Sequence, residues 1–249
     1  MESLRQIQSV LAFLTILPAA RDHDIERAAK GMYLFPVAGV IIGALVGALA
    51  FGILPFMDPL LVGLVVAAAF VIITGVHHTD ALADFADGLM AKGDREAKRK
   101  AMSDPAVGSA GVAALVLYFA GIVIAFHGGG LAPGLGILAS IITAEVIAKY
   151  TMVFMANRGR SAWEGSSSPF TAAMKDKRKI LAATGIMIVV VWIASSYAGL
   201  VALAASLAIA GVMYYAAGKS FGGISGDVLG ASNEVARLVS LIVLASVVI

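Results

Sequence analysis

The chain contains no cysteine and few charged residues. Without cysteine, disulfide bonds, thiolate metal sites and cysteine nucleophiles are all excluded. Only 14% of the 249 residues are charged, whereas 60% are hydrophobic. An average globular domain has about 25% charged residues, and so few charges cannot cover the surface of a water-soluble domain. The composition argues against a cytosolic enzyme, a nucleic-acid-binding protein and a disordered segment, and it indicates an integral membrane protein.

Long stretches without Asp, Glu, Lys or Arg are present instead. A helix needs about 20 residues to cross the hydrocarbon core of a bilayer. Clusters of glycine, proline and serine at 127–134 and 195–199 divide the two longest stretches into helical hairpins. We therefore predict an all-α, polytopic helical bundle that forms a single membrane domain over residues 1–249. The seven predicted spans lie near residues 32–54, 60–78, 108–126, 135–156, 180–196, 200–217 and 235–249.

Residues 2–17 precede the first predicted span and mix Arg5, Gln6 and Gln8 with the apolar run FLTIL. A cleavable signal peptide needs a longer apolar run and a cleavage site of small residues. The charged run RDHDIER follows here instead. This segment predicts an N-terminal interfacial or re-entrant helix.

Lys and Arg are missing from alternate predicted loops. The loops at 55–59, 127–134 and 196–200 hold none, whereas the other loops hold 16 of the 18. Because basic residues accumulate in cytoplasmic loops, the charged loops are expected to face the cytoplasm, as in a multi-pass protein of the cytoplasmic membrane. Of the 16 acidic residues, only Asp58 lies on the predicted outer side. The charged loops are 20–31, 92–105, 157–179 and 218–237.

Three aspartates follow the second predicted span at a helical spacing. If the span continues as a helix, Asp80, Asp84 and Asp87 lie within about 60° of one another around its axis. Carboxylates repel more strongly near a membrane boundary, where the dielectric constant is lower, and a divalent cation removes that repulsion. Their oxygen atoms favour Mg²⁺ or Mn²⁺ over a softer metal held by the neighbouring histidines. We predict these three aspartates as metal ligands; a solvated acidic helix end is the alternative interpretation.

Other polar clusters are candidates for binding phosphate. The glycine-rich segment 221–234 offers backbone N–H groups to an anion, or it forms a re-entrant loop with a structural role. The basic run that contains Lys98 either contacts phosphate or determines topology, and Asp104 precedes a proline as a helix cap would. Inside the fourth span, Glu145 and Lys149 either form a structural ion pair or face a site within the bundle.

Five motifs, in order along nearly the whole chain, resemble the cobalamin synthase family, the adenosylcobinamide-GDP ribazoletransferases. The most specific of them is HTDALADFADG, which contains the three aspartates. The motifs are FLTILP at 13–18, FPVAG at 35–39 with Gly43, HTDALADFADG at 78–88, MSDPAVG at 102–108 with Gly111, and GGISGDVLGA at 222–231 with Glu234.

The resemblance implies Mg²⁺-dependent transfer of the adenosylcobinamide-phosphate group from adenosylcobinamide-GDP to α-ribazole or its 5′-phosphate, with release of GMP. It implies that Asp80, Asp84 and Asp87 hold the metal and the diphosphate. Ala106 stands where the family has arginine, so Arg99, Lys98 or Arg158 would replace that phosphate contact. The candidate site residues are Asp84, Asp87 and Asp104 as catalytic groups and His78, Lys98, Arg158, Gly222, Gly223, Asp227 and Glu234 as substrate-binding groups.

The expected partners are the two small-molecule substrates and the lipid bilayer, with no nucleic acid. A homo-oligomer or an association with other enzymes of the cobalamin pathway is left open by the sequence.

Two other functions compete with this one. A phosphotransferase of the CDP-alcohol type also places aspartates on helices near the membrane surface, but its Ala-Arg pair is absent after Asp87-Gly88. A transporter of a cation or cofactor would place ionisable groups near the bilayer midplane and often shows inverted repeats. Here the acidic residues gather on one predicted side and no repeat is visible, which disfavours transport.

Overall fold

The computed structural model describes residues 2–19, 24–127, 131, 134–165 and 167–247. Throughout these residues the regular structure is helical, without a strand, and a single parallel bridge joins Ser161 to Ile224. The all-α prediction is therefore confirmed. Most of the hairpin predicted at 127–134 falls outside the described residues.

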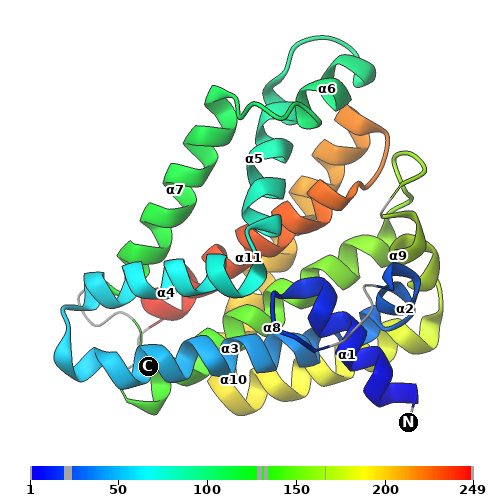
Figure 1. The fold of residues 1–249 in the computed structure, drawn as a ribbon. Coiled ribbons are helices and arrows are strands. Elements are labelled where there is room, and N and C mark those ends of the chain that lie inside the picture. Colours follow the sequence, from blue (N-terminus) through cyan, green and yellow to red (C-terminus); the bar gives the residue numbers. More distant parts are fainter. Residues whose placement is uncertain (1, 20–23, 128–130, 132–133, 166, 248–249) are drawn as a thin grey trace.

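The helices follow one another with short connections (Figure 1). Their bounds are α1 (Glu2–Leu14), α2 (Ile25–Lys30), η1 (Met32–Leu34), α3 (Phe35–Ile53), η2 (Leu54–Phe56), α4 (Pro59–Thr74), α5 (His77–Met90), α6 (Arg95–Met102), α7 (Ser109–Ala125), α8 (Leu135–Arg158), α9 (Ser168–Ala173), α10 (Lys177–Phe221) and α11 (Gly226–Ser246).

Several of these helices are long and apolar enough to cross a membrane. Among the described residues, four segments meet both criteria alone: α3 with its flanking turns, α8, α10 and α11. Helix α7 is apolar but shorter, and α4 with α5 meets the criteria only as a bent pair. The predicted spans at 32–54, 60–78, 108–126 and 135–156 correspond to α3, α4, α7 and α8.

Helix α10 contains two spans. Its 45 residues would extend about 68 Å as one straight helix, far more than a bilayer core requires. At Ser196 the backbone leaves helical geometry, with φ 46° and ψ −131°. A Cβ atom on Gly199 would lie 2.7 Å from Val191 Cγ1, although residues eight apart in a continuous helix are separated by about 12 Å. The chain therefore turns back here, as predicted, and Figure 1 shows the two parts in yellow and orange.

The second predicted span ends earlier than expected. Gly75 and Val76 adopt left-handed backbone conformations, with φ 66° and 60°, which terminate α4. Helix α5 then starts in a direction 96° away from α4. The three aspartates therefore lie on one helix, as their spacing required, but this helix is α5 and not a continuation of the span; we treat α4 as the spanning segment and α5 as the helix that follows it.

The last predicted span, 235–249, has the wrong starting point. Helix α11 already begins at Gly226, where Ser225 Oγ accepts a hydrogen bond from the backbone N–H of Val228 at 3.2 Å. Four glycines between 222 and 230 favoured a loop in the sequence, but a serine N-cap starts a helix here. Most of the predicted loop 218–237 is consequently helical, and Arg237 is buried inside the bundle.

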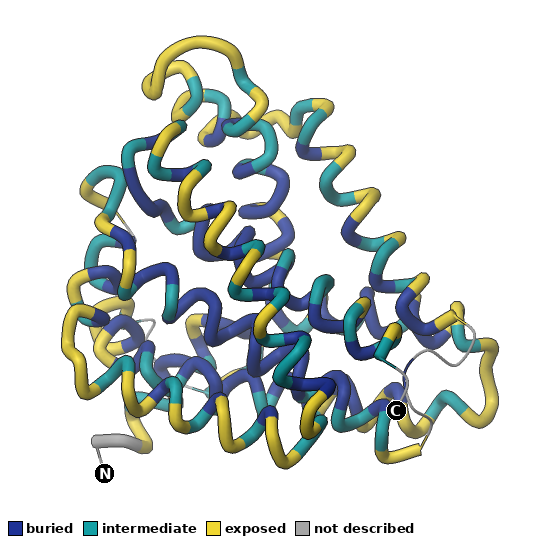
Figure 2. The backbone as a smooth tube through the Cα atoms, turned by 180° about the vertical axis from the view of Figure 1, so that it is seen from behind, coloured by how far each residue is buried: buried dark blue, intermediate teal, exposed yellow. Residues whose placement is uncertain are grey.

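Close packing of α3 against α8 forms the centre of the bundle. Gly39, Gly43 and Gly47 lie along one face of α3, and a Cβ atom on any of them would approach α8 to 2.7–2.8 Å. Small residues four apart allow two helix backbones to come this near to each other within a membrane. Figure 2 shows that the buried residues follow the middle of the molecule, whereas the loop at the top is exposed.

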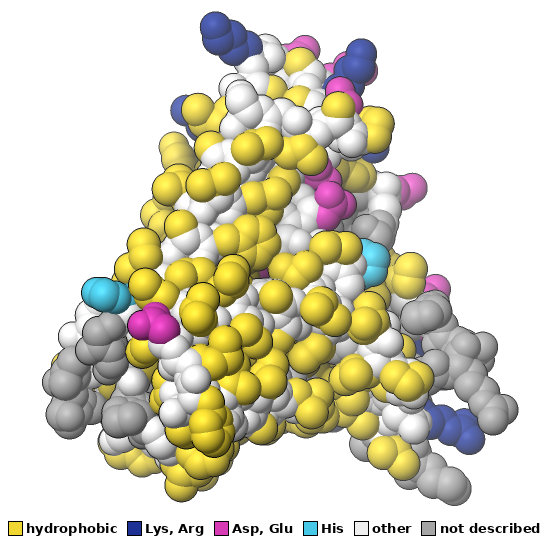
Figure 3. All heavy atoms as spheres, turned by 60° about the vertical axis from the view of Figure 1, so that its left-hand side comes forward, with side chains coloured by type: hydrophobic (Ala, Val, Ile, Leu, Met, Phe, Trp, Pro, Cys, Tyr) yellow, Lys and Arg dark blue, Asp and Glu magenta, His cyan; other side chains and the backbone are white. Residues whose placement is uncertain are grey.

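The molecule has a lower and an upper layer in Figure 1. Helices α3, α8 and the first part of α10 lie along the bottom, and α5, α7, α11 and the second part of α10 rise from them. Hydrophobic side chains cover most of the face in Figure 3, while Lys and Arg lie mainly at its upper end. The two layers diverge toward α1, α2 and α9, and the candidate site lies in this region.

Candidate active site

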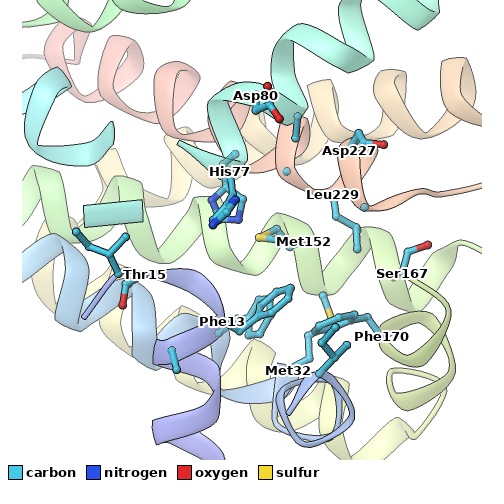
Figure 4. Close-up of a pocket in the computed structure, with 18 of the residues that line it drawn as sticks. Phe13, Thr15, Met32, His77, Asp80, Met152, Ser167, Phe170, Asp227 and Leu229 are labelled. Atoms are coloured by element: carbon cyan, nitrogen blue, oxygen red, sulfur yellow. The ribbon is translucent and has the colours of Figure 1, made fainter. Parts of the chain in front are cut away.

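A cavity of about 730 Å³ opens between the two layers. Its walls come from α1, α5, α8, α9 and the start of α11, together with the chain that follows α1. In Figure 4, Asp80 and Asp227 lie on one side, Phe13 and Phe170 lie on the other, and Met152 lies between them. One half of the cavity is therefore acidic and the other half is apolar.

The acidic half comes from two helices that are far apart in sequence. Asp80 belongs to α5, Asp227 lies in the first turn of α11, and both line the cavity. Asp84 is partly buried one turn further along α5. Burial and the charges of Asp80, Asp227 and Asp87 raise the pKa of Asp84 to about 6. These carboxylates therefore lie close enough for each to disfavour the ionisation of Asp84.

Asp87 has a different environment from the other two predicted metal ligands. Its Oδ2 accepts a hydrogen bond from the backbone N–H of Gly108 at 2.7 Å, and its Oδ1 accepts one from Gly111 at 2.9 Å. A carboxylate at a helix N-terminus satisfies free N–H groups and interacts favourably with the helix dipole. The structure thus directs Asp87 to the start of α7, while Asp80 and Asp84 are grouped with Asp227.

His78 connects the cavity to a buried polar cluster. The side chain lines the cavity, but its residue is only 8% exposed. Its Nδ1 lies 3.4 Å from Asn233 Nδ2 and 3.8 Å from Glu234 Oε1. Burial and the nearby Lys149 and Arg237 charges lower the pKa of His78 well below its ordinary value, so the ring is neutral and the approach to Glu234 is not an ion pair.

The cluster behind His78 consists of four charged residues from two spanning helices, α8 and α11. Lys149 Nζ donates to Glu145 at 3.2 Å and to Asn233 Oδ1 at 2.8 Å. Arg237 pairs with both Glu145 and Glu234. All four charged side chains are at most 1% exposed. Glu145 and Lys149 are therefore an ion pair within a larger network, and Glu234 belongs to that network instead of the cavity wall.

Arg237 has further partners in the network. Its Nη1 donates to the Tyr118 hydroxyl at 2.7 Å, and its guanidinium carbon lies 4.3 Å from the centre of the Phe70 ring. Among the described side chains, its Nη2 is the buried nitrogen without a hydrogen-bond partner. The contact with Phe70 partly compensates for the desolvation of this cation. The network thus ties α4, α7, α8 and α11 together directly behind the cavity.

The apolar half of the cavity was missed by reasoning from the sequence. The tilted rings of Phe13 and Phe170 have centres 4.9 Å apart, and the ring centre of Phe35 lies 6.1 Å from that of Phe170. Phe13 and Phe35 each belong to a motif that carried the family resemblance, but neither was assigned a role. Phe35 and Phe170 are buried, whereas Phe13 is 36% exposed, so Phe13 supplies the aromatic surface on which a flat ligand can stack.

The remaining predicted site residues lie away from the cavity. Asp104 is exposed and caps a turn by accepting from the N–H of Ala106 at 2.9 Å. Lys98 Nζ donates to the carbonyls of Leu89 and Ala91 at 2.7 Å each, at the end of α5. Arg158 lies beside Phe154 on the surface.

The two predicted glycines have structural roles. Gly222 ends α10 with a left-handed φ of 83°, a conformation that glycine adopts readily. A Cβ atom on Gly223 would lie 2.6 Å from the carbonyl oxygen of Arg160, so only glycine allows the two loops to approach this closely.

No three His, Asp or Glu side chains in the described part of the chain lie close enough to enclose a metal ion. Magnesium does not need such a cage, because one or two carboxylates, water and substrate phosphates usually complete its coordination. Asp80 and Asp227, which both line the cavity, would supply the two carboxylates for such a site. The ion pairs among the described residues use other carboxylates, those of Asp24, Glu145 and Glu234.

Fold and site together define a class of protein: a polytopic helical membrane protein with a cavity that combines clustered carboxylates with an aromatic wall. The chain belongs to the cobalamin-5-phosphate synthase family (CobS), whose model matches residues 6–245. Both the fold class and the resemblance expected from the sequence are thereby confirmed.

Named relatives match nearly the whole chain. A protein from Methanocella arvoryzae is 33% identical over 98% of this chain and 96% of its own length. Relatives from Archaeoglobus fulgidus and Halorubrum lacusprofundi are 31% and 33% identical over 92% and 96% of this chain, and over 92% and 95% of their own lengths. All three carry the name adenosylcobinamide-GDP ribazoletransferase. No solved structure matches the chain.

Proposed function

We propose that the protein transfers the adenosylcobinamide-phosphate group of adenosylcobinamide-GDP to α-ribazole or its 5′-phosphate. The observation that carries this proposal is the match to named ribazoletransferases over almost the full length of both chains. The cavity supports it because its two halves suit the two parts of such a reaction. A flat heterocyclic base requires an apolar aromatic wall, and a diphosphate requires cations or a metal held by carboxylates.

The aromatic wall is the proposed binding surface for the base of α-ribazole. Phe13, which is 36% exposed, offers the stacking surface, and the buried rings of Phe35 and Phe170 pack against it. A ribazole held there would direct its sugar toward Asp80 and Asp227 on the opposite side of the cavity. This geometry holds an acceptor hydroxyl close to the carboxylates.

Asp80 and Asp227, whose carboxylates both line the cavity, are the proposed holders of Mg²⁺. When bound, such an ion neutralises charge that develops on a diphosphate during transfer. Asp84 has a different assignment, because it is partly buried one turn from Asp80 on the same helix. We assign it as acceptor of the proton from the ribazole hydroxyl.

The proposed transfer is a single displacement at phosphorus. The ribazole oxygen forms a bond to the phosphorus that carries the cobinamide, and the bond from that phosphorus to the bridging oxygen breaks. GMP leaves with the bridging oxygen, and the hydroxyl proton passes to a carboxylate. The chain's contribution is to position the two substrates and to accept this proton.

Release of GMP by membranes that contain the protein tests the proposal. With adenosylcobinamide-GDP and α-ribazole together, we expect GMP and the joined product to form only when Mg²⁺ is present. Asp84→Asn should lower the rate by about 100-fold or more, because a positioned general base contributes at least that much. Asp176→Asn, an exposed cap of α10, is the matched control and should retain full activity.

Two outcomes would contradict the proposal. If correctly folded protein releases no GMP with both substrates and Mg²⁺, the proposed transfer reaction is wrong. If the Asp84→Asn variant turns over at the wild-type rate, the assignment of Asp84 as proton acceptor is wrong.

We further infer that the charged loops and the cavity face the cytoplasm from the cytoplasmic membrane. The inference is supported by the basic residues of alternate predicted loops, 15 of the 18 Lys and Arg residues once the buried Arg237 is set aside. Labelling of single cysteines introduced at Lys100 and Met57, in a chain without cysteine, tests it. An impermeant reagent added outside intact cells should label only the cysteine at position 57.

A further inference from the structure

A second hollow in the structure is lined by basic residues. It has a volume of about 560 Å³ and lies between α6, the loop after α8 and the end of α10. We call it the arginine groove, defined by Arg95, Arg99, Arg160 and Trp163. Glu96 is the carboxylate in its lining, so three positive charges face one negative charge.

Backbone carbonyls, and not carboxylates, accept the recorded hydrogen bonds of the groove arginines. Arg95 donates to the carbonyls of Gly218 and Lys219 at 3.5 and 3.4 Å, and Arg160 donates to the carbonyl of Gly222 at 3.3 Å. These contacts are long, and they use the exposed carbonyls at the end of α10. Among the described residues, the recorded ion pairs involve none of the three arginines. The groove therefore offers an uncompensated positive field to an anion.

Trp163 supplies an aromatic surface within this positive field. Its residue is partly buried, and the guanidinium carbon of Arg99 lies 4.4 Å from the centre of its ring. Arg99 covers one face of the ring, so the opposite face of Trp163 and the guanidinium groups provide the two contacts that a nucleotide requires. The base stacks on the ring, and the phosphate accepts charge-assisted hydrogen bonds from arginine.

The arginine groove and the cavity are built on the same short segment. Gly222 lines the groove, whereas Gly226 and Asp227 line the cavity. Four residues span at most about 14 Å, so one elongated substrate can reach both sites. The loop of the groove pairs with this segment, since the Ile224 N–H donates to the Arg160 carbonyl at 2.8 Å and the Ala162 N–H donates to the Ile224 carbonyl at 3.0 Å.

We propose that the arginine groove binds the guanosine monophosphate end of the donor, the part that leaves as GMP. This inference rests on the proposed function and names a separate subsite for one of its substrates. The phosphate lies among the three arginines and the guanine stacks on Trp163. The bond that breaks then lies between the groove and the carboxylates of the cavity.

Fluorescence of Trp163 in purified, detergent-solubilised protein gives a direct test. The chain has two tryptophans, so Trp192→Phe leaves Trp163 as the remaining one. Addition of GMP to this variant should quench its emission in a saturable way. Arg99→Gln and Arg160→Gln, made in the same background, should each weaken GMP binding about tenfold, which corresponds to loss of one charge-assisted hydrogen bond.

The matched control is Arg178→Gln, an exposed arginine outside the groove, which should bind GMP as the parent variant does. Absence of quenching by GMP, or unchanged affinity in both groove variants, would overturn the proposal. Equal affinity for GMP and ribose 5-phosphate would also overturn it, because the groove would then recognise phosphate without a base.

Two further measurements test whether the groove binds a nucleotide or a lipid headgroup, and separate failure of the subsite from failure of the transfer reaction. If nanodiscs containing phosphatidylglycerol shift the emission of Trp163 while GMP does not, the groove contacts lipid and the proposal fails. If GMP binds but the protein forms no GMP from both substrates with Mg²⁺, the result contradicts the transfer reaction and supports the nucleotide subsite. If turnover proceeds and Arg160→Gln leaves the KM for adenosylcobinamide-GDP unchanged, the subsite fails and the reaction stands.

Discussion

Removal of one charge from the buried network should destabilise the protein strongly. Glu145, Glu234, Lys149 and Arg237 together carry no net charge and are at most 1% exposed. Glu145→Gln leaves two cations with one carboxylate, and Lys149→Met leaves two carboxylates with one cation. Loss of one partner from a buried ion pair costs about 3–5 kcal/mol, because the remaining charge stays buried without compensation.

The double variant Glu145→Gln/Lys149→Met should be more stable than either single variant. It removes one charge of each sign, and Arg237 still pairs with Glu234 and bonds the Tyr118 hydroxyl. We expect the double variant to recover about 1–3 kcal/mol relative to the less stable single variant, which is the usual range for coupled neighbours.

Thermal unfolding in detergent, followed by far-ultraviolet circular dichroism, measures these differences. A loss of about 3–5 kcal/mol corresponds to a decrease in Tm of roughly 6–20 °C for a chain of this size. Asp24→Asn provides the control, because its pair with Arg27 is exposed and separated by 3.6 Å. Such a surface pair contributes about 0–1 kcal/mol.

Two results would refute this reasoning about the network. One is an unfolding temperature of Glu145→Gln within about 2 °C of the wild-type value. The other is a double variant that unfolds below both single variants, since opposite buried charges would then not compensate each other.

Two further stability predictions come from helix packing and capping. Gly43→Ala should destabilise the protein by about 1–3 kcal/mol, because the new Cβ atom would lie 2.7 Å from Ile142 Cα, whereas Gly52→Ala on the same helix meets nothing within 4 Å and should be neutral or stabilising. A lower Tm for Gly52→Ala than for Gly43→Ala would contradict this. Asp87→Ala should lower stability by about 1–2 kcal/mol through loss of two backbone hydrogen bonds, and Asp94→Ala at the exposed start of α6 should cost less. Equal unfolding temperatures for the two alanine variants would argue against the capping role.

Most of the fold could be predicted from the long stretches of sequence that lack charged residues. Hydrophobic length sets where a helix can cross a bilayer, and it located α3, α7, α8 and both parts of α10. Helix ends were less predictable, because they depend on local backbone geometry. The left-handed conformation of Val76 carries no sequence signal, since a β-branched residue rarely adopts it.

The candidate site was predictable only in part. Helical spacing brought Asp80 and Asp84 to one face, and the glycine-rich motif gave Asp227, which the structure places beside them. Spacing alone could not show that Asp87 caps α7, because its partners Gly108 and Gly111 lie 21 and 24 residues away in sequence. The link between Glu145 and Arg237, 92 residues apart, was beyond local patterns for the same reason.

The distribution of charges in the network has a consequence for membrane insertion. Helix α8 carries Glu145 with Lys149, and α11 carries Glu234 with Arg237, so each helix contains its own counter-ion within one turn. Apart from Arg158 and Asp227 at their ends, both helices can therefore enter the bilayer with paired charges, which avoids most of the cost of a charge in hydrocarbon. The pairing of Arg237 with Glu145 forms only after the two helices meet. A slip of one helical turn would break that pairing, so the same charges that make insertion tolerable also set the register of assembly.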